Sequence, residues 1–212
     1  MLALLHTSPA HVPVFDALRD EDHQGLDLWH FVDEELLARA RREGPEAVTD
    51  AVRDALAQAV AAGAQAVLCT CSTIGAVAES AGADIGVPVL RGDRPMAAAA
   101  VAAGARVVVA ATLESTLGPT VALVEEEGRR IGRPVAVRTL LVEGAWARFE
   151  SGDDEGCARL VADAVDAIED ADAIVLAQGS MAGAQHLTTT RIPVLSSPRL
   201  GLGAGARAVR AG

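Results

Sequence analysis

Two segments of the sequence resemble each other, and only one of them has a cysteine where chemistry would be expected. Residues 64–73 read AQAVLCTCST, and residues 171–180 read ADAIVLAQGS. When the two segments are aligned, Cys71 falls opposite Gln178. A thiol can act as an acid, a base or a nucleophile, whereas an amide has no useful pKa for proton transfer. The two halves of the chain are therefore predicted to contribute different chemistry.

The repeat continues beyond these two segments. Residues 2–7 (LALLHT) are echoed by residues 107–112 (VVVAAT), and residues 87–91 (VPVLR) recur as residues 192–196 (IPVLS). Three blocks in the same order predict two similar lobes. We expect the first lobe to span 1–92 and the second to span 93–192, with 193–212 returning to the first lobe.

The fold class follows from short apolar runs that alternate with longer helical stretches, a pattern typical of a parallel α/β sheet. The runs are almost continuously apolar, as expected for strands covered on both faces. The predicted strands are 2–6, 26–30, 66–70, 87–90, 106–111, 135–140, 173–177 and 193–195. The predicted helices are 33–42, 45–62, 95–103, 115–131 and 154–170. This pattern predicts two pseudo-symmetric lobes with parallel sheets and a site in the cleft between them.

Polar residues follow the predicted strands at the ends where open α/β sheets bind ligands. Hydroxyls and free backbone N–H groups at such ends can hold carboxylate oxygens. At any single position, capping of the next helix by Ser or Thr is the simpler interpretation. Together these ends predict a site for a small carboxylate. The residues concerned are Thr7, Ser8, Cys71, Ser72, Thr73, Thr112, Ser115, Thr116, Gln178, Gly179, Ser180, Ser196 and Ser197.

Cys71 is the candidate for catalysis because it lies at a strand end, just before a predicted helix whose dipole would favour the thiolate. Cys69, inside the strand, and Cys157, in an apolar helix, are expected to be buried structural thiols. His186 follows the second repeat segment and is either a catalytic acid or base or a surface residue.

The other four histidines form two groups. The same two interpretations hold for His6 and His30, which end two other strands. His11 and His23 are expected to be exposed.

Several classes of function are excluded by what the sequence lacks. There is no lysine, so neither a Schiff-base mechanism nor a Walker phosphate loop can form. A formal net charge of −11 argues against nucleic acid or an anionic membrane as a partner. No apolar run approaches the length of a membrane span, and no signal peptide is recognisable, so we expect a cytoplasmic protein. No spacing resembles a metal site, and none is predicted.

Two motifs look suggestive but are weak. The glycine-rich stretch 201–206 is a poor dinucleotide match and is better explained as the loosely packed start of a last helix. Ser180 superficially resembles a hydrolase nucleophile in a Gly-x-Ser-x-Gly turn. The first glycine of that motif is Gln178 here, so the match fails.

The chain resembles the aspartate/glutamate racemase superfamily, which includes hydantoin racemases, maleate isomerases and arylmalonate decarboxylases. The first motif of that group is Cys-Asn-Thr after a strand, and here Cys71-Ser72-Thr73 follows an apolar run. The second motif reads Gly-Cys-Ala-Gly-Met in the hydantoin racemase branch, and residues 177–181 (AQGSM) stand in its place. The resemblance spans essentially the whole chain.

This resemblance implies two flavodoxin-like lobes, no cofactor and two cysteines flanking the α-carbon of the substrate. Cys71 would be the thiol of the first lobe. The implied carboxylate-binding residues are Thr7, Ser8, Ser72, Thr73, Thr112, Ser115, Thr116 and Ser180. Gln178 departs from the pattern because two-base racemisation needs a base on each face of the α-carbon. An amide there could instead hydrogen-bond a carboxylate or an enediolate oxygen.

Three functions stay open at this point. The first is one-sided proton chemistry by Cys71, which covers isomerisation and the decarboxylation of a malonate-type acid. The second is a racemase or epimerase whose second base is His186 or another group. The third is a non-catalytic protein that binds small acids. We predict an enzyme of the racemase and isomerase type that acts on a small carboxylate, with decarboxylation as the alternative. The sequence leaves homo-oligomerisation open.

Overall fold

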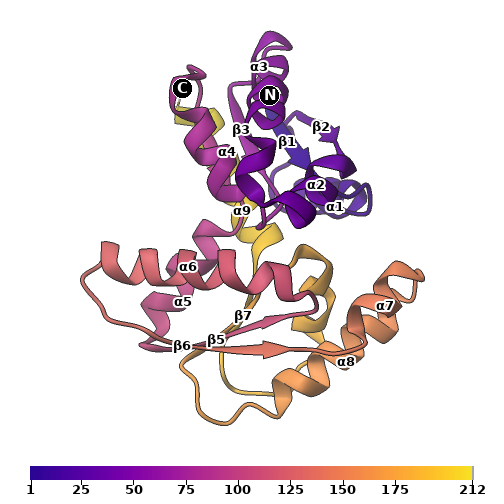
Figure 1. Cartoon of the computed structure of the whole chain (residues 1–212), viewed down its shortest axis with the longest axis vertical. Helices are drawn as coiled ribbons and strands as arrows, with labels where there is room; N and C mark the ends of the chain where they lie inside the picture. The colour runs from indigo at the N-terminus through magenta and orange to yellow at the C-terminus, as the bar shows by residue number, and fades with distance from the viewer. Residues whose placement is uncertain (212) are drawn as a thin grey trace. The chain divides into compact units, whose positions relative to one another are not determined.

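The computed structural model describes residues 1–211, which form two compact units, each with its own four-stranded parallel sheet (Figure 1). Unit 1 comprises Met1–Asp93 and the segment from Pro198 onwards, and unit 2 comprises Arg94–Ser197. We expected 193–212 to return to the first lobe as a whole. The return begins only after Ser197, because the strand at Val194–Ser196 pairs within the second sheet.

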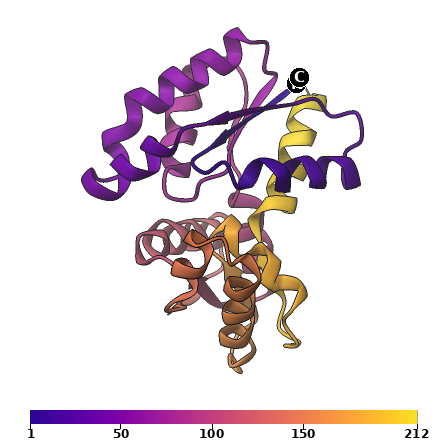
Figure 2. The same ribbon diagram turned by 90° about the vertical axis from the view of Figure 1, so that its right-hand side faces the viewer.

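The sheet of unit 1 has the strand order β2-β1-β3-β4. Its strands are β1 (Leu2–His6), β2 (Leu28–Val32), β3 (Ala66–Cys69) and β4 (Val89–Arg91). Its helices are α1 (His11–Asp22), α2 (Glu34–Glu43), η1 (Pro45–Val48), α3 (Thr49–Ala61), α4 (Gly75–Ala81), η2 (Gly82–Asp84) and α9 (Ser197–Ala211). Alternate residues of β1 enter two different cores: Ala3 and Leu5 pack with α2, α3 and α4, whereas Leu2 and Leu4 pack with α1 and α9. Figure 2 shows helices on both sides of this sheet.

The sheet of unit 2 has the strand order β6-β5-β7-β8. Its strands are β5 (Arg106–Ala111), β6 (Ala136–Leu141), β7 (Ala173–Leu176) and β8 (Val194–Ser196). Its helices are α5 (Arg94–Ala103), α6 (Glu114–Arg130), α7 (Ala145–Glu150), α8 (Asp154–Asp166) and η3 (Gly179–His186). One face of the sheet packs on α5 and α6, and the other packs on α7, α8 and η3, so α6 and α8 lie on opposite sides of the sheet in Figure 1.

The register of the strands confirms the internal repeat. In unit 1, Leu2 is the partner of Ala66, and in unit 2 the equivalent residues Val107 and Ala173 are partners. β3 ends two residues before Cys71, and β7 ends two residues before Gln178. Cys71 and Gln178 are therefore equivalent positions in two sheets of the same topology.

The predicted secondary structure differs from the observed one mainly at helices. All eight strands are present, with ends displaced by up to two residues; β2, for example, is Leu28–Val32 where 26–30 was expected. The helix expected at 45–62 is divided into η1 and α3. Two helices, α1 and α7, were not predicted, and α4 was expected after Cys71 but without bounds. The two unpredicted helices bury little: only Phe15 is buried within α1, and only Ala145 within α7.

The glycine-rich stretch 201–206 lies inside α9. A Cβ atom on Gly201 would lie 2.6 Å from the carbonyl oxygen of Gly92, and one on Gly205 would lie 2.7 Å from a methyl group of Leu2. These glycines therefore allow α9 to approach β1 and the loop after β4 closely. Close packing of a helix, rather than a nucleotide, explains this stretch.

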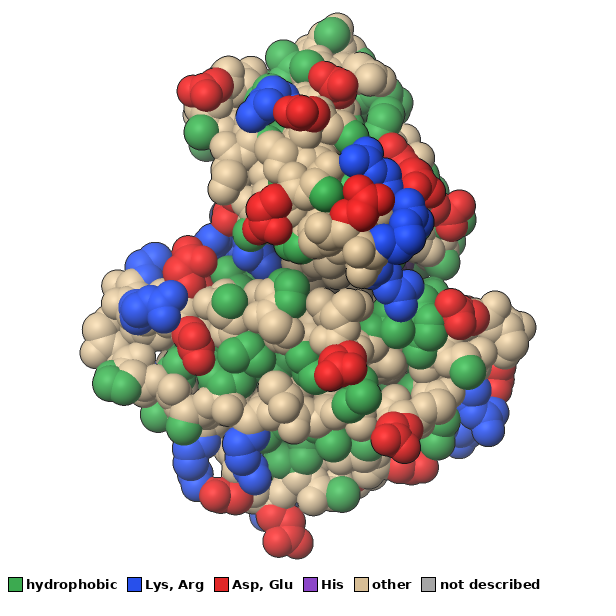
Figure 3. Space-filling view, viewed as in Figure 1, with side chains coloured by type: hydrophobic (Ala, Val, Ile, Leu, Met, Phe, Trp, Pro, Cys, Tyr) green, Lys and Arg blue, Asp and Glu red, His purple; other side chains and the backbone are tan. Residues whose placement is uncertain are grey.

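The surface carries both signs of charge. On the face in view, acidic and basic side chains are interspersed, without an extended basic patch (Figure 3). Within residues 1–211, no helix is both long and apolar enough to cross a membrane.

Candidate functional site

Cys71 lies just beyond the carboxyl end of β3, and its residue is 8% exposed. It packs in the same apolar cluster as Ile74 and Val77, and the thiol of Cys69 donates to its carbonyl oxygen at 3.6 Å. We expected a helix to begin directly after Cys71. A turn intervenes, and α4 begins only at Gly75. The thiol is thus held by the strand end and the turn, rather than by the first turn of a helix.

The other two thiols have the structural character expected of them. Cys69 and Cys157 are each 1% exposed. Burial raises the pKa of the Cys69 thiol, and the neighbouring Cys71 adds to this effect. Burial, with Asp154 and Asp153 nearby, also raises the pKa of the Cys157 thiol. Both thiols therefore stay protonated at neutral pH, which leaves Cys71 as the candidate for proton transfer.

A chain of hydrogen bonds runs beneath the strand end that carries Cys71. The His6 ring is fully buried, and its Nδ1 lies 2.8 Å from Oγ1 of Thr70. On its other side, Nε2 of His6 lies 2.9 Å from Nδ1 of His30. Nε2 of His30 lies 3.3 Å from Oδ1 of Asp16 in α1. The chain thus connects a partly exposed carboxylate on α1 to the residue that precedes Cys71.

The charge state of His6 follows from its surroundings. Burial, with smaller contributions from His11 and His30, lowers the pKa of His6 to about 3, so the ring is neutral at pH 7. Its ring stacks on His30, with centroids 5.1 Å apart, and packs against Phe15. We expected His11 to be exposed. It is largely covered instead, burial lowers the pKa of its ring, and its Nδ1 is buried without a hydrogen-bond partner.

In unit 2, the amide of Gln178 is held in one orientation. Its Oε1 accepts from the backbone N–H of Thr112 at 2.7 Å, from the hydroxyl of Thr112 at 3.0 Å and from the backbone N–H of Leu113 at 3.3 Å. Two backbone N–H donors require the oxygen, not the nitrogen, to face them, so the orientation of the amide is unambiguous. The NH₂ group is therefore directed away from β5 as a donor.

The remaining predicted residues divide by burial. Thr7, Ser72 and Thr73 of unit 1 are at most 9% exposed, and Thr112 and Thr116 of unit 2 are similarly covered. Ser8, Gly179 and Ser180 are half-buried, whereas Ser115 and His186 are exposed. Ser196 and Ser197 are buried, and the hydroxyl of Ser196 donates to Oε1 of Gln185. Two of the predicted residues, Thr112 and Gln178, are in direct contact with each other.

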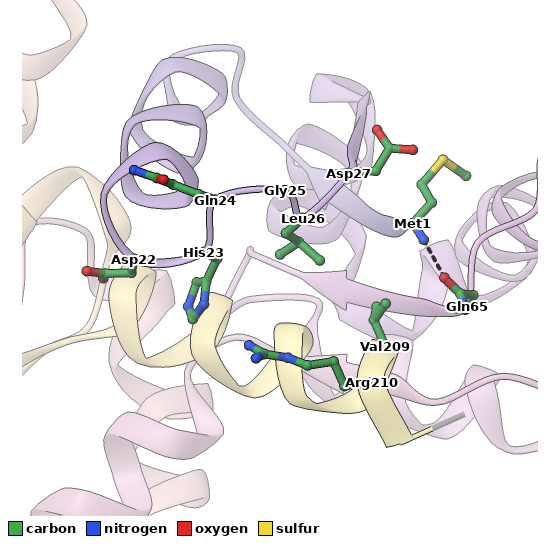
Figure 4. Close-up of a pocket in the computed structure, with 10 residues that line it drawn as sticks. All are labelled: Met1, Asp22, His23, Gln24, Gly25, Leu26, Asp27, Gln65, Val209 and Arg210. Atoms are coloured by element: carbon green, nitrogen blue, oxygen red, sulfur yellow. Dashed lines mark hydrogen bonds between the residues drawn. The ribbon is translucent and has the colours of Figure 1, made fainter.

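One pocket lies elsewhere in unit 1 (Figure 4). It has a volume of about 420 Å³ and is lined by residues that precede β1, β2 and β3, together with Val209 and Arg210 of α9. Because the strands are parallel, this pocket lies at the amino edge of the sheet, whereas Cys71 lies at the carboxyl edge. The pocket holds neither a thiol nor any of the predicted site residues.

No metal centre was found among residues 1–211: no three His, Cys, Asp or Glu side chains are grouped so that they could hold an ion.

Comparison with known proteins identifies the family. The model of the Asp/Glu/Hydantoin racemase family matches residues 10–204. The chain belongs to this family. No curated protein sequence matches it.

Solved structures of the same fold include racemases and a decarboxylase. An aspartate racemase from Picrophilus torridus is 14% identical with a TM-score of 0.73, and the match covers 99% of this chain and 94% of that one. A glutamate racemase from Bacillus anthracis is 13% identical with a TM-score of 0.74 and coverage of 100% and 82%. Arylmalonate decarboxylase is 20% identical with a TM-score of 0.66 and coverage of 100% and 94%. At these identities the likeness shows the fold, which confirms the two-lobe α/β prediction.

Proposed function

We propose that this protein catalyses proton transfer, without a cofactor, at the carbon next to the carboxylate of a small organic acid, with the Cys71 thiol as the group that carries the proton. Membership of the racemase family supports an enzyme of this kind. Cys71 lies at the carboxyl end of its sheet, where α/β proteins bind ligands, whereas the other two thiols are buried within a strand and a helix.

The observation that carries the proposal is the fixed amide of Gln178 at the position equivalent to Cys71. Because Oε1 is engaged by Thr112 and Leu113, only the NH₂ group is available to a ligand. An NH₂ donor can stabilise negative charge on a carboxylate or enediolate oxygen, but it cannot take up a proton. We therefore assign proton transfer to Cys71 alone and oxyanion binding to Gln178.

The contact between Thr112 and Gln178 gives Thr112 a different role from the one expected from the sequence. We expected it to bind the carboxylate directly, but its hydroxyl and N–H both donate to Gln178. We propose that Thr112 orients Gln178. The buried hydroxyls of Thr7, Ser72 and Thr73 remain the proposed carboxylate ligands.

One thiol can supply the proton for two reactions. In hydrogen exchange, the thiolate removes the α-proton, the electron pair moves into the carboxylate as an enediolate, and the thiol returns a proton to the same face, so that the configuration is retained. In decarboxylation, the bond to the departing carboxylate breaks, carbon dioxide leaves, and the Cys71 thiol protonates the enediolate. The replacement of a second thiol by Gln178 favours decarboxylation as the second candidate, since that reaction needs a proton on one face only.

The test is incubation of the protein with amino acids, hydantoins and substituted malonates in deuterated water, followed by chiral chromatography and NMR. Deuterium at the α-carbon with configuration retained, or a decarboxylated product of one configuration, supports one-sided transfer. Complete loss of configuration contradicts it and directs attention to His186 as a second base. Absence of exchange and turnover in every class contradicts catalysis and supports a protein that only binds small acids.

Substitution of Gln178 sharpens the test. Gln178→Cys places a second thiol at the equivalent position and is expected to introduce racemisation in place of one-sided exchange. Gln178→Glu keeps the size but removes the NH₂ donor, and we expect roughly a hundredfold loss of turnover, the usual effect of deleting one oxyanion donor. An unchanged rate in Gln178→Glu would contradict the oxyanion role.

A further inference from the structure

The hydrogen-bond chain beneath Cys71 has no counterpart in unit 2. His6 and Thr70 occupy positions equivalent to Ala111 and Ala177, because Thr70 N–H donates to the carbonyl of Leu5 just as Ala177 N–H donates to the carbonyl of Ala110. Two methyl side chains cannot form a hydrogen bond. The chain of hydrogen bonds is therefore present only beneath the strand end that bears Cys71. It is absent beneath the strand end that bears Gln178.

The protons of this hydrogen-bond chain can be arranged in two ways, because the Thr70 hydroxyl has one hydrogen and two neighbouring acceptors. Oγ1 of Thr70 lies 2.8 Å from Nδ1 of His6 and 3.1 Å from the carbonyl oxygen of Leu5. If the hydroxyl donates to His6, then Nε2–H of His6 donates to His30, and Nε2–H of His30 donates to Asp16. Both rings are then neutral and every contact in the chain is a hydrogen bond.

The second arrangement contains one more proton. If the Thr70 hydroxyl donates to Leu5 instead, Nδ1–H of His6 must donate to Thr70, and Nε2 of His6 must accept from Nδ1–H of His30. Nε2 of His30 can then donate to Asp16 only if His30 is an imidazolium. Addition of a proton at His30 thus exchanges donor and acceptor in the contact between His30 and His6 and in the contact between His6 and Thr70.

Side chains from α1, from β2 and from the residue after β3 surround the rings of His6 and His30. His6 faces His11 and Phe15 of α1, His30 of β2 and Thr70 after β3. His30 faces Asp16 of α1, which also pairs with Arg19 at 3.3 Å. The His30 side chain is 15% exposed and that of Asp16 is 40% exposed, so a proton from solvent can reach this end of the chain.

We propose that Asp16, His30, His6 and Thr70 form a positioning network for Cys71, in which protonation of His30 is transmitted to the Thr70 hydroxyl and changes how the strand end bearing Cys71 is held. In the protonated form, the carbonyl of Leu5 accepts from both the N–H and the hydroxyl of Thr70, which fixes the strand end more firmly. In the neutral form only the N–H contact remains. Cys71 follows Thr70 directly, so its reactivity depends on this state.

This proposal rests on the proposed function only for its consequence in catalysis, because the reactivity of the thiol can be measured without a substrate. The experiment is the rate of alkylation of Cys71 by iodoacetamide between pH 4.5 and 9.5. Tandem mass spectrometry separates modification at Cys71 from modification at Cys69. For the wild type we expect an inflection from the thiol and a second, smaller inflection, of roughly fivefold, from the network.

Matched variants separate the network from simple folding effects. Thr70→Val keeps the shape but removes the hydroxyl, so the second inflection should disappear, whereas Thr70→Ser should retain it. Asp16→Asn should shift it to lower pH, because the amide oxygen still accepts from His30 but no longer offers a negative charge to the imidazolium, whereas Asp20→Asn, which alters the other carboxylate paired with Arg19, should leave it in place. A second inflection that persists in Thr70→Val overturns the proposal, as does a wild-type profile with a single inflection. Failure of the turnover assays with retention of these profiles would count against the proposed function alone.

Discussion

Unit 1 is predicted to lose stability in acid through His6. The folded-state pKa of His6 is about 3, against an unfolded value of 6.5. Because the folded pKa is depressed, the stabilising contribution is fully present above pH 6.5 and is lost as the pH falls toward 3. Between pH 8 and pH 4 the calculated loss is about 3 kcal/mol for this one group.

The test compares the wild type with His6→Asn, a smaller side chain that can still hydrogen-bond Thr70. Urea unfolding is followed by tryptophan fluorescence in a Trp146→Phe background, so that Trp29 in β2 reports on unit 1. His6→Asn is expected to be less stable at pH 8, since it leaves a cavity, but its free energy of unfolding should fall by about 3 kcal/mol less on going to pH 4.

The comparison uses the difference between two pH values within each variant, so the cavity cost cancels. His23→Asn serves as the control, because His23 is partly exposed and lies at the other edge of the sheet. Parallel pH dependences in His6→Asn and the wild type would refute the reasoning that His6 is buried as a neutral ring.

Three further predictions concern stability. Arg91 and Asp93 form an ion pair in which each side chain is 3% exposed. Asp93→Ala should cost about 3–5 kcal/mol in urea unfolding, because it removes one partner of a buried pair, and a cost below about 1 kcal/mol would count against that burial. Burial alone would raise the pKa of Glu127, but hydrogen bonds from Arg130 and Arg94 outweigh it and hold the pKa below its usual value of 4.5. Glu127 therefore stabilises unit 2 above pH 4.5, and Glu127→Gln should flatten the acid dependence of unfolding below pH 5; an unchanged slope would contradict this. Gly201→Ala should lower the melting temperature because its Cβ would meet backbone, whereas Gly203→Ala, whose Cβ meets only the ends of side chains, should change it little.

The sequence was sufficient to predict the two sheets, because nearly every strand is an apolar run and the same three blocks occur twice. The repeat also identified Cys71 and Gln178 as equivalent, and the register of β3 and β7 confirms this. The helix α1 could not be predicted in the same way, since it buries only Phe15. Its position depends on tertiary packing against β1 and α9 rather than on its own periodicity.

The site was predicted less completely than the fold. His6 and His30 were visible as histidines at strand ends, but their contact depends on the pairing of β1 with β2. Asp16 joins them from α1, a helix that the sequence did not reveal. The orientation of Gln178 likewise depends on backbone N–H groups, which are present at every residue and leave no signature in the sequence.

The central claim, that Cys71 carries the proton, is tested most directly by the rate of deuterium exchange at the α-carbon of a substrate in Cys71→Ser, with Cys157→Ala as the thiol control. General acid–base catalysis by one side chain contributes about 10²–10⁴-fold, so Cys71→Ser should lose at least a hundredfold in rate while Cys157→Ala stays within about twofold of the wild type. Exchange by Cys71→Ser at the wild-type rate would contradict the claim.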